Sequence, residues 1–178
     1  SEAERVVEEL ERLLKKNRDD NERVIRRLEE LLDRLREKNE RAIEELRKLL
    51  DELKKVVDRG DVSERVVDKL LKEIKEKIDR VREEHRKLLE DIERTIRKVE
   101  KEHKESIERI RRRAEELKDL IRRELLREIE ERLKTLSEES KRLIDRIREE
   151  LKRLTKESED LLKDIERLLR EVKERART

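Results

Sequence analysis

The two histidines, His85 and His103, are the side chains best suited to chemistry in this sequence, which contains no cysteine. They are 18 residues apart, which is about 27 Å along an α-helix, so they cannot share a metal ion. Glu102-His103 lacks the second histidine of a zinc-protease helix. A Ser–His nucleophile pair would need an oxyanion loop, and no such segment accompanies the histidines. A glycine-rich phosphate loop is also excluded, because the sequence contains a single glycine. The sequence therefore predicts no catalytic, cofactor or metal site.

Other polar side chains recur at the same 18-residue spacing as the histidines. Five turns of 3.6 residues make 18, so residues at this spacing share one face of a straight helix. These polar pairs are Asn21 with Asn39, Ser137 with Thr155, and Ser140 with Ser158.

The apolar residues follow the same period. Residues 6–14, 24–32 and 42–50 are three similar segments, and isoleucines recur at Ile74, Ile92 and Ile110 and again at Ile129, Ile147 and Ile165. Each series marks one apolar stripe on a helix that is otherwise charged. A heptad repeat would force a left-handed supercoil, whereas an 18-residue repeat favours straight helices.

Two breaks divide these stripes into three helices. Gly60 can end the first helix in a left-handed conformation, and Asp61 or Ser63 can cap the next. After Leu117 the stripe resumes one residue late, which predicts a turn near 118–120 with Asp119 as N-cap. We therefore expect an all-α, antiparallel three-helix bundle forming a single domain over 1–178, with helices over about 2–58, 63–117 and 120–176.

An antiparallel arrangement brings the polar residues together in two layers. The pairs Asn39–His85 and Asn21–His103 are both centred on position 62, beside Gly60. The pairs His85–Thr155 and His103–Ser137 are both centred on position 120, where the phase changes. One predicted layer contains Asn39, His85, Thr155 and Ser158, the other Asn21, His103, Ser137 and Ser140, with Asn17 and Ser106 as an extension of the second.

Three interpretations of these layers remain open. Amide, imidazole and hydroxyl groups supply both donors and acceptors, so satisfied networks could fix helix register and pairing, as a buried Asn does in coiled coils. The histidines could instead form a pH switch. The residues could also face the surface.

The charge and hydropathy of the sequence argue against several classes of binding partner. Charged residues make up 60% of the chain, yet the net charge is only +2 and the two signs are interleaved. Nucleic-acid binding would require clustered positive charge. No apolar run approaches the roughly 20 residues that span a bilayer, no targeting signal is visible, and the aromatic residues that favour a membrane surface are missing.

The 18-residue repeat, the Gly60-Asp61 loop, the aliphatic core and the polar layers together resemble de novo designed straight helical bundles with buried hydrogen-bond networks. The resemblance covers the whole chain, although the second turn lacks the Gly or Pro such connections often carry. Spectrin-like repeats are a weaker match because their tryptophan is missing. The resemblance implies a hyperstable scaffold or assembly module without a natural biochemical function. The alternatives are a helix-binding or pH-responsive oligomerisation module, and a domain-swapped dimer in which the second and third helices are continuous.

Overall fold

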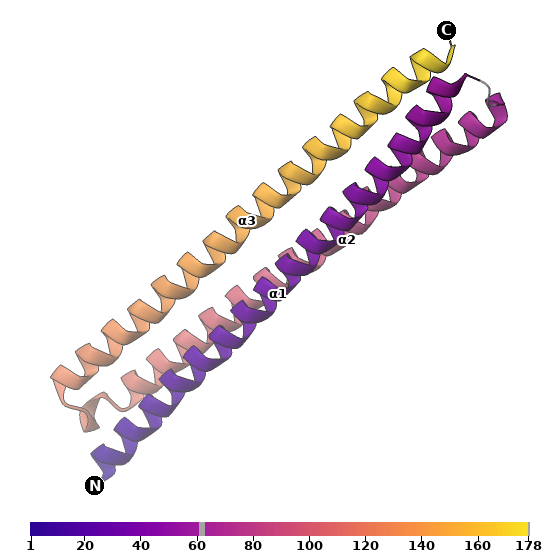
Figure 1. The fold of residues 1–178 in the computed structure, drawn as a ribbon. Helices are drawn as coiled ribbons and strands as arrows, with labels where there is room; N and C mark the ends of the chain where they lie inside the picture. The colour runs from indigo at the N-terminus through magenta and orange to yellow at the C-terminus, as the bar shows by residue number, and fades with distance from the viewer. Residues whose placement is uncertain (61–62, 178) are drawn as a thin grey trace. The chain divides into compact units, whose positions relative to one another are not determined.

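The computed structural model describes residues 1–60 and 63–177, and it consists of three long α-helices (Figure 1). Helix α1 spans Glu2–Arg59, α2 spans Glu64–Glu116 and α3 spans Arg123–Arg177, with a short 3-10 helix, η1, at Lys118–Leu120. The prediction of an all-α fold built from three long helices is confirmed. No helix among the described residues is long and apolar enough to cross a membrane.

These helices form because the sequence holds few residues that oppose them. Proline is absent, and Leu, Glu, Lys and Arg lose little side-chain freedom in a helix. Ion pairs one turn apart add local support, as between Arg86 and Glu90, whose atoms are 2.6 Å apart. The Ser1 hydroxyl accepts a hydrogen bond from the Glu4 amide and caps α1.

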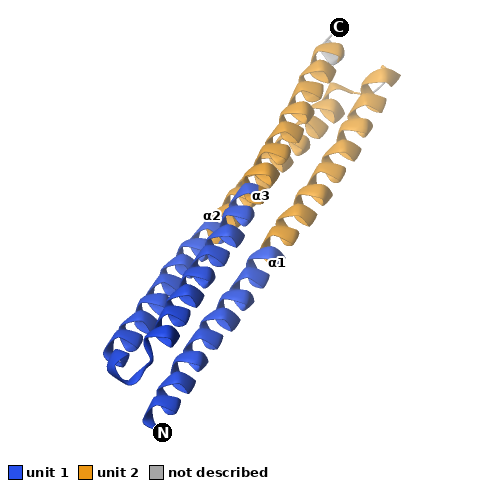
Figure 2. Cartoon of the chain, turned by 90° about the vertical axis from the view of Figure 1, so that its left-hand side faces the viewer, with its two compact units in different colours: residues 1–30, 92–149 blue, residues 31–91, 150–178 orange. Residues whose placement is uncertain are grey.

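The chain divides into two compact units (Figure 2). Unit 1 contains residues 1–30 and 92–149, and unit 2 contains residues 31–91 and 150–178. Each unit takes one segment from each of the three helices. Within each unit α1 and α2 run antiparallel, as Glu9–Arg113 and Asn17–Ser106 show in unit 1 and Asn39–His85 and Glu45–Lys77 show in unit 2. The prediction that the chain behaves as a single domain stays a prediction.

Each unit has its own aliphatic core. Leu10 from α1, Ile110 from α2 and Leu133 from α3 are almost fully buried in the core of unit 1. Leu46 and Ile74 are fully buried in unit 2, where Leu162 packs with them. These residues belong to the 18-residue series, so the sequence period placed the apolar stripes correctly.

The two connections differ in how they end their helices. Gly60 has a φ of 70°, so the left-handed helix end predicted for it is confirmed. Asp61, one of the two predicted caps of α2, lies outside the described residues. The carbonyl of the other, Ser63, accepts hydrogen bonds from the amides of Val66 and Val67.

The second connection lies where the phase change predicted it, but it is longer. Helix α2 ends at Glu116 and α3 begins only at Arg123, because the chain passes through η1 and an extended Ile121 (φ −112°, ψ 137°). Asp119 lies inside η1 and is not the N-cap of α3, so that prediction is wrong; Arg122 directly precedes the helix. Ile121 is 7% exposed and joins the core of unit 1, so a buried side chain anchors a turn that has neither Gly nor Pro.

Candidate functional site: two buried polar layers

The first group of polar residues lies in unit 2 and is called here the His85 layer: Asn39, His85, Thr155 and Ser158. His85 Nδ1 lies 3.3 Å from Asn39 Oδ1 on α1, and Nε2 lies 3.4 Å from Thr155 Oγ1 on α3. The Thr155 hydroxyl also donates to the Leu151 carbonyl at 2.8 Å. It therefore accepts from His85 Nε2–H, which leaves Nδ1 facing Asn39. One imidazole thus contacts polar side chains on both neighbouring helices.

The chemistry of the His85–Asn39 contact follows from that assignment. If Nε2 carries the proton, a neutral Nδ1 is an acceptor and pairs with the Asn39 amide only when the NH₂ group faces it. Oxygen and nitrogen of an amide are assigned from such networks, so a 180° rotation of the Asn39 amide completes the bond. A protonated ring would instead donate from both nitrogens.

The second group lies in unit 1 and is called the His103 layer: Asn21, His103, Ser137 and Ser140. Here the Ser140 hydroxyl, on a side chain only 2% exposed, donates to Asn21 Oδ1 at 3.2 Å. His103 is half-buried, and its Nε2 is buried without a hydrogen-bond partner. Ser137 is exposed, so this predicted member lies at the rim of the layer and not within it.

The predicted extension of the His103 layer is present as a separate pair. Asn17 Nδ2 donates to Ser106 Oγ at 2.7 Å, and Asn17 is 4% exposed. Its Oδ1 is buried and has no partner. The His103 layer and this pair therefore leave two buried polar atoms unpaired, whereas both ring nitrogens of His85 have neighbours.

Burial lowers the pKa of both histidines below the ordinary value of 6.5. For His85 the main cause is loss of solvation, and the negative charge of Glu159 opposes it. For His103 loss of solvation again dominates, and the backbone of Leu136 opposes it. Both imidazoles are therefore held toward the neutral form.

The grooves between helices are hollowed at the polar layers. A cavity of about 420 Å³ in unit 1 is lined by Asn17, Asn21, His103 and Ser106, and one of about 440 Å³ by His103, Ser137 and Ser140 among others. A smaller one, about 280 Å³, borders Asn39 and Ser158 in unit 2. Asn and Ser fill less space than Leu, which contributes to the grooves at these levels.

Glu100 and His103 have the spacing closest to a metal-binding motif in the described part of the chain. Glu100 lies three residues before His103, a spacing seen in di-metal helix bundles, but its carboxylate forms an ion pair with Arg148. The described residues contain no cluster of three or more His, Asp or Glu side chains that could hold an ion. The prediction that the chain has no catalytic, cofactor or metal site stays a prediction.

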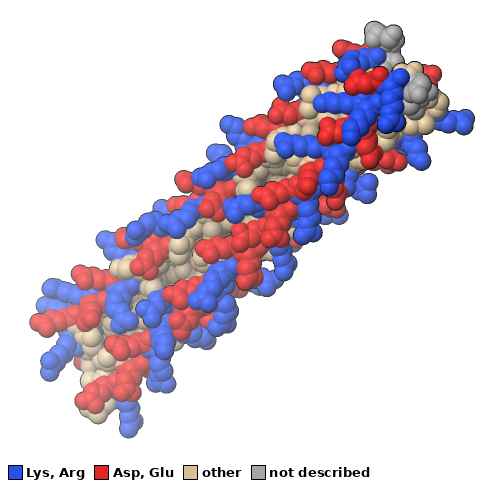
Figure 3. Space-filling model, in the orientation of Figure 1, with Lys and Arg blue, Asp and Glu red and all other residues tan. Residues whose placement is uncertain are grey.

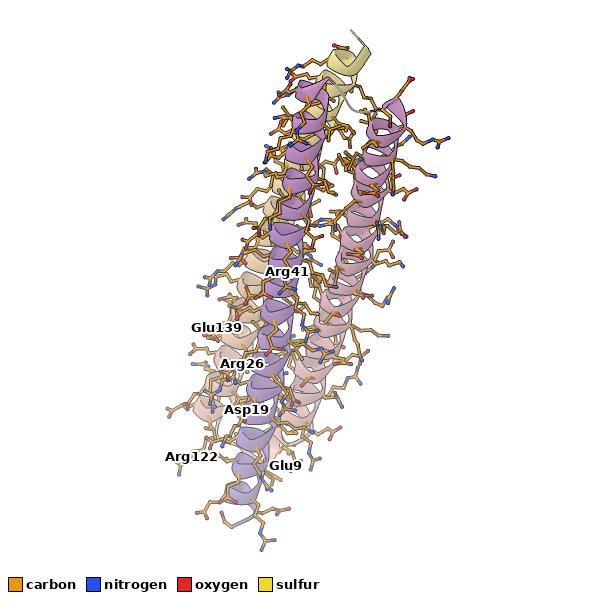
Figure 4. The ribbon with its side chains drawn as sticks, turned by 45° about the vertical axis from the view of Figure 1, so that its right-hand side comes forward. Glu9, Asp19, Arg26, Arg41, Arg122 and Glu139 are labelled. Carbon is orange, nitrogen blue, oxygen red and sulfur yellow. The ribbon has the colours of Figure 1, made fainter. Side chains whose placement is uncertain are left out.

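The sequence pattern did not reveal the ion pairs that link different helices. Most charged side chains do point away from the cores, as Figure 4 shows for Asp19, Arg26 and Arg41 on α1. Others bridge neighbouring helices. Arg113 on α2, for example, donates from Nε to Glu9 on α1 at 2.8 Å and lowers the pKa of that carboxylate.

No protein-family model and no curated protein matches this chain. Among solved structures, the chain is similar to one described as a computationally designed three-helix bundle. The two are 24% identical, the match covers 99% of this chain and 87% of that chain, and the TM-score is 0.42. The TM-score is too low to support the fold, which is established by the helices and cores of this chain. In sequence pattern and helix content, the chain resembles computationally designed helical bundles.

Proposed function

We propose that this chain is a designed structural scaffold in which the buried polar layers specify how the three helices pair. The observation that carries the proposal is the position of His85, which lies between a polar side chain of α1 and one of α3. An apolar core tolerates many packings, because aliphatic contacts are non-directional. A directional contact to each neighbour restricts the register, because a shift of one helical turn would leave buried polar groups unpaired at a cost of about 1–3 kcal/mol each.

The test replaces the whole contact set at once. In the variant Asn39→Leu/His85→Leu/Thr155→Val no polar partner is left behind, so the folded state should be as stable as the parent or more stable. Pairing should become less specific. Light scattering should then find more than one molar mass, and amide NMR spectra should show extra or broadened signals.

A matched control carries three polar-to-leucine changes on the exposed face of α1, at Asp19, Arg26 and Arg41 (Figure 4). It adds comparable apolar surface without touching a layer. If the layer variant keeps one mass and one set of sharp signals, the layers do not specify pairing and the proposal is wrong. If the control associates as strongly as the layer variant, nonspecific association through the added apolar side chains explains the result.

A second candidate is a pH-responsive module. It is supported by the buried His85 and the half-buried His103, whose pKa values are lowered by burial. Protonation would place a charge inside each layer, next to the hydroxyl and amide groups described above. Helix binding, the other alternative, gains no such support, because Val66 and Leu120 are the only large apolar side chains that are strongly exposed among the described residues. The pH-responsive function is tested by the acid-stability experiment in the Discussion.

A further inference from the structure

The two polar layers are nearly copies of each other, and this leaves one alternative register open. Asn39, His85 and Ser158 of one layer correspond, one 18-residue repeat along each helix, to Asn21, His103 and Ser140 of the other. The core is repeated at the same spacing, so that Ile147 corresponds to Ile165. A helix displaced by one repeat along its neighbours would therefore meet similar apolar and polar groups. The layers alone cannot oppose that displacement.

One ion cluster beside the His85 layer connects α2 to α3. Arg82 lies 3.1 Å from the carboxylate of Glu159 and also forms an ion pair with Glu166. The three side chains are only 36–44% exposed. This unit 2 cluster has one cation on α2 and two anions on α3.

The equivalent positions in unit 1 carry the opposite charges. Glu100 takes the place of Arg82 on α2, while Lys141 and Arg148 take the places of Glu159 and Glu166 on α3. Glu100 forms an ion pair with Arg148, and Lys141 lines the same cavity as both. The unit 1 cluster therefore has one anion on α2 and two cations on α3.

We propose that these two clusters of opposite polarity oppose the staggered pairing of α2 with α3 of another copy, which the polar layers leave possible. A displacement of α3 by one repeat in one direction places Arg82 beside Lys141 and Arg148. A displacement in the other direction places Glu100 beside Glu159 and Glu166. Like charges face each other in both cases, and their repulsion opposes the staggered pairing.

The α1–α2 pairing shows the same arrangement. Glu9 pairs with Arg113 in unit 1 and Glu45 pairs with Lys77 in unit 2. The α1 position midway between the two glutamates is Arg27, which carries the opposite charge. A displacement of one repeat in either direction brings Arg27 to Arg113 or to Lys77.

The Asn17–Ser106 pair adds a second discriminator between α1 and α2. Unlike the two layers, this pair has no copy, because the positions one repeat away are Leu35 on α1 and Leu88 on α2. Displacement would set buried Asn17 against Leu88 and remove its 2.7 Å hydrogen bond to Ser106. A buried amide without a partner is unfavourable.

Within one chain the short connections already prevent a displacement of one repeat, so the clusters act on pairing between copies. Staggered association of helices from different molecules is the competing state. This inference rests on the structural role proposed above, but it concerns charged residues outside the layers. It can fail while that role stands.

The experiment exchanges the two α2 charges in the variant Arg82→Glu/Glu100→Arg, which leaves net charge, cores and polar layers unchanged. In the normal register both clusters become repulsive, while the staggered register becomes attractive. We expect the light-scattering mass at high protein concentration to rise to at least about twice that of the parent, since staggered pairing requires a second copy. Circular dichroism should show the helix content of the parent.

The matched control adds the reciprocal changes on α3, so that both clusters are again attractive but with inverted polarity. These added changes are Lys141→Glu, Arg148→Glu, Glu159→Lys and Glu166→Arg. Its mass and guanidinium midpoint should return to the parent values. If the exchange variant unfolds, Arg82→Gln/Glu100→Gln removes the attraction without adding repulsion and should show a smaller rise in mass. If the exchange variant folds and has the mass of the parent, the proposal is wrong. If the exchange variant unfolds, the same result for the glutamine variant would overturn the proposal.

Discussion

The two histidines occupy equivalent positions in the repeat but have different surroundings. His85 has polar neighbours at both ring nitrogens, whereas His103 Nε2 has none. In the His103 layer, Asn21 Oδ1 instead accepts a hydrogen bond from the Ser140 hydroxyl. The hydrogen-bonding contribution of the two side chains to stability should therefore differ, even though the sequence makes them look alike.

Replacing each histidine by leucine tests this difference. His85→Leu leaves the amide of Asn39 without its neighbour and should lower the free energy of unfolding by about 1–2 kcal/mol. His103→Leu removes the unpaired Nε2 and adds apolar volume but loses the hydrogen bond to the Leu136 backbone, so it should cost less than His85→Leu. Guanidinium unfolding of both variants at pH 7.5 makes the comparison. Equal losses would mean that His103 Nε2 also has a hydrogen-bond partner in solution.

The lowered pKa values predict that acid weakens the fold. Between the folded pKa and the unfolded value of about 6.5, the unfolded chain binds more protons than the folded chain. Stability is therefore complete above pH 6.5 and declines as the pH falls through that value toward the lower folded pKa. The guanidinium midpoint of the parent should fall between pH 7.5 and pH 5, whereas His85→Asn/His103→Asn should change less.

The comparison with the double variant is necessary because carboxylates also titrate toward acid pH. Ion pairs such as Glu9–Arg113 lower the pKa of their carboxylates and lose strength when these protonate. That loss is common to both proteins. If parent and variant lose the same stability on acidification, the histidines do not act as a pH switch.

At the scale of the elements, the second connection depends on one buried side chain. Ile121→Glu would place a charge in the core of unit 1, where Ile121 is 7% exposed. The turn should be destabilised relative to a continuous α2–α3 helix, which favours the domain-swapped dimer. We expect a mass near twice the 22.0 kDa of the chain. Leu120→Glu is the control because Leu120 is 40% exposed, and it should keep the parent mass.

The first connection should tolerate substitution better. The φ of 70° at Gly60 is unfavourable for other residues, yet a Cβ added there meets nothing within 4 Å. Gly60→Ala should therefore cost only the backbone strain, about 1 kcal/mol. Thermal or denaturant unfolding checks this value. A loss of several kcal/mol would mean that the loop contributes contacts beyond its backbone conformation.

These elements show which features a sequence period can predict. The apolar stripes predicted the helices and the core residues, because an 18-residue period fixes which residues share a face. The period did not reveal that Ile121 leaves the helix and turns into the core, which depends on tertiary packing. It also did not reveal that Ser137 is exposed and that His103 Nε2 has no partner, because hydrogen bonds depend on side-chain conformations as well as on faces.

At the scale of the whole molecule, the surface carries both signs of charge throughout. Figure 3 shows Lys and Arg interleaved with Asp and Glu on the visible face, with other residues between them. The net charge is +2 from 54 basic and 52 acidic residues. Most exposed pairs add little stability individually, so the apolar cores must provide most of it.

We therefore expect stability well above the usual range of small domains. Leu10, Leu28 and Leu46, one 18-residue series on α1, are each 0% exposed, and full burial of such a side chain contributes about 1.5–3 kcal/mol. Both units contain many aliphatic residues of this kind. Circular dichroism should show no unfolding transition below about 90 °C. A cooperative transition near about 55 °C, typical of mesophilic domains, would mean that the hollowed polar layers admit water and weaken the neighbouring cores.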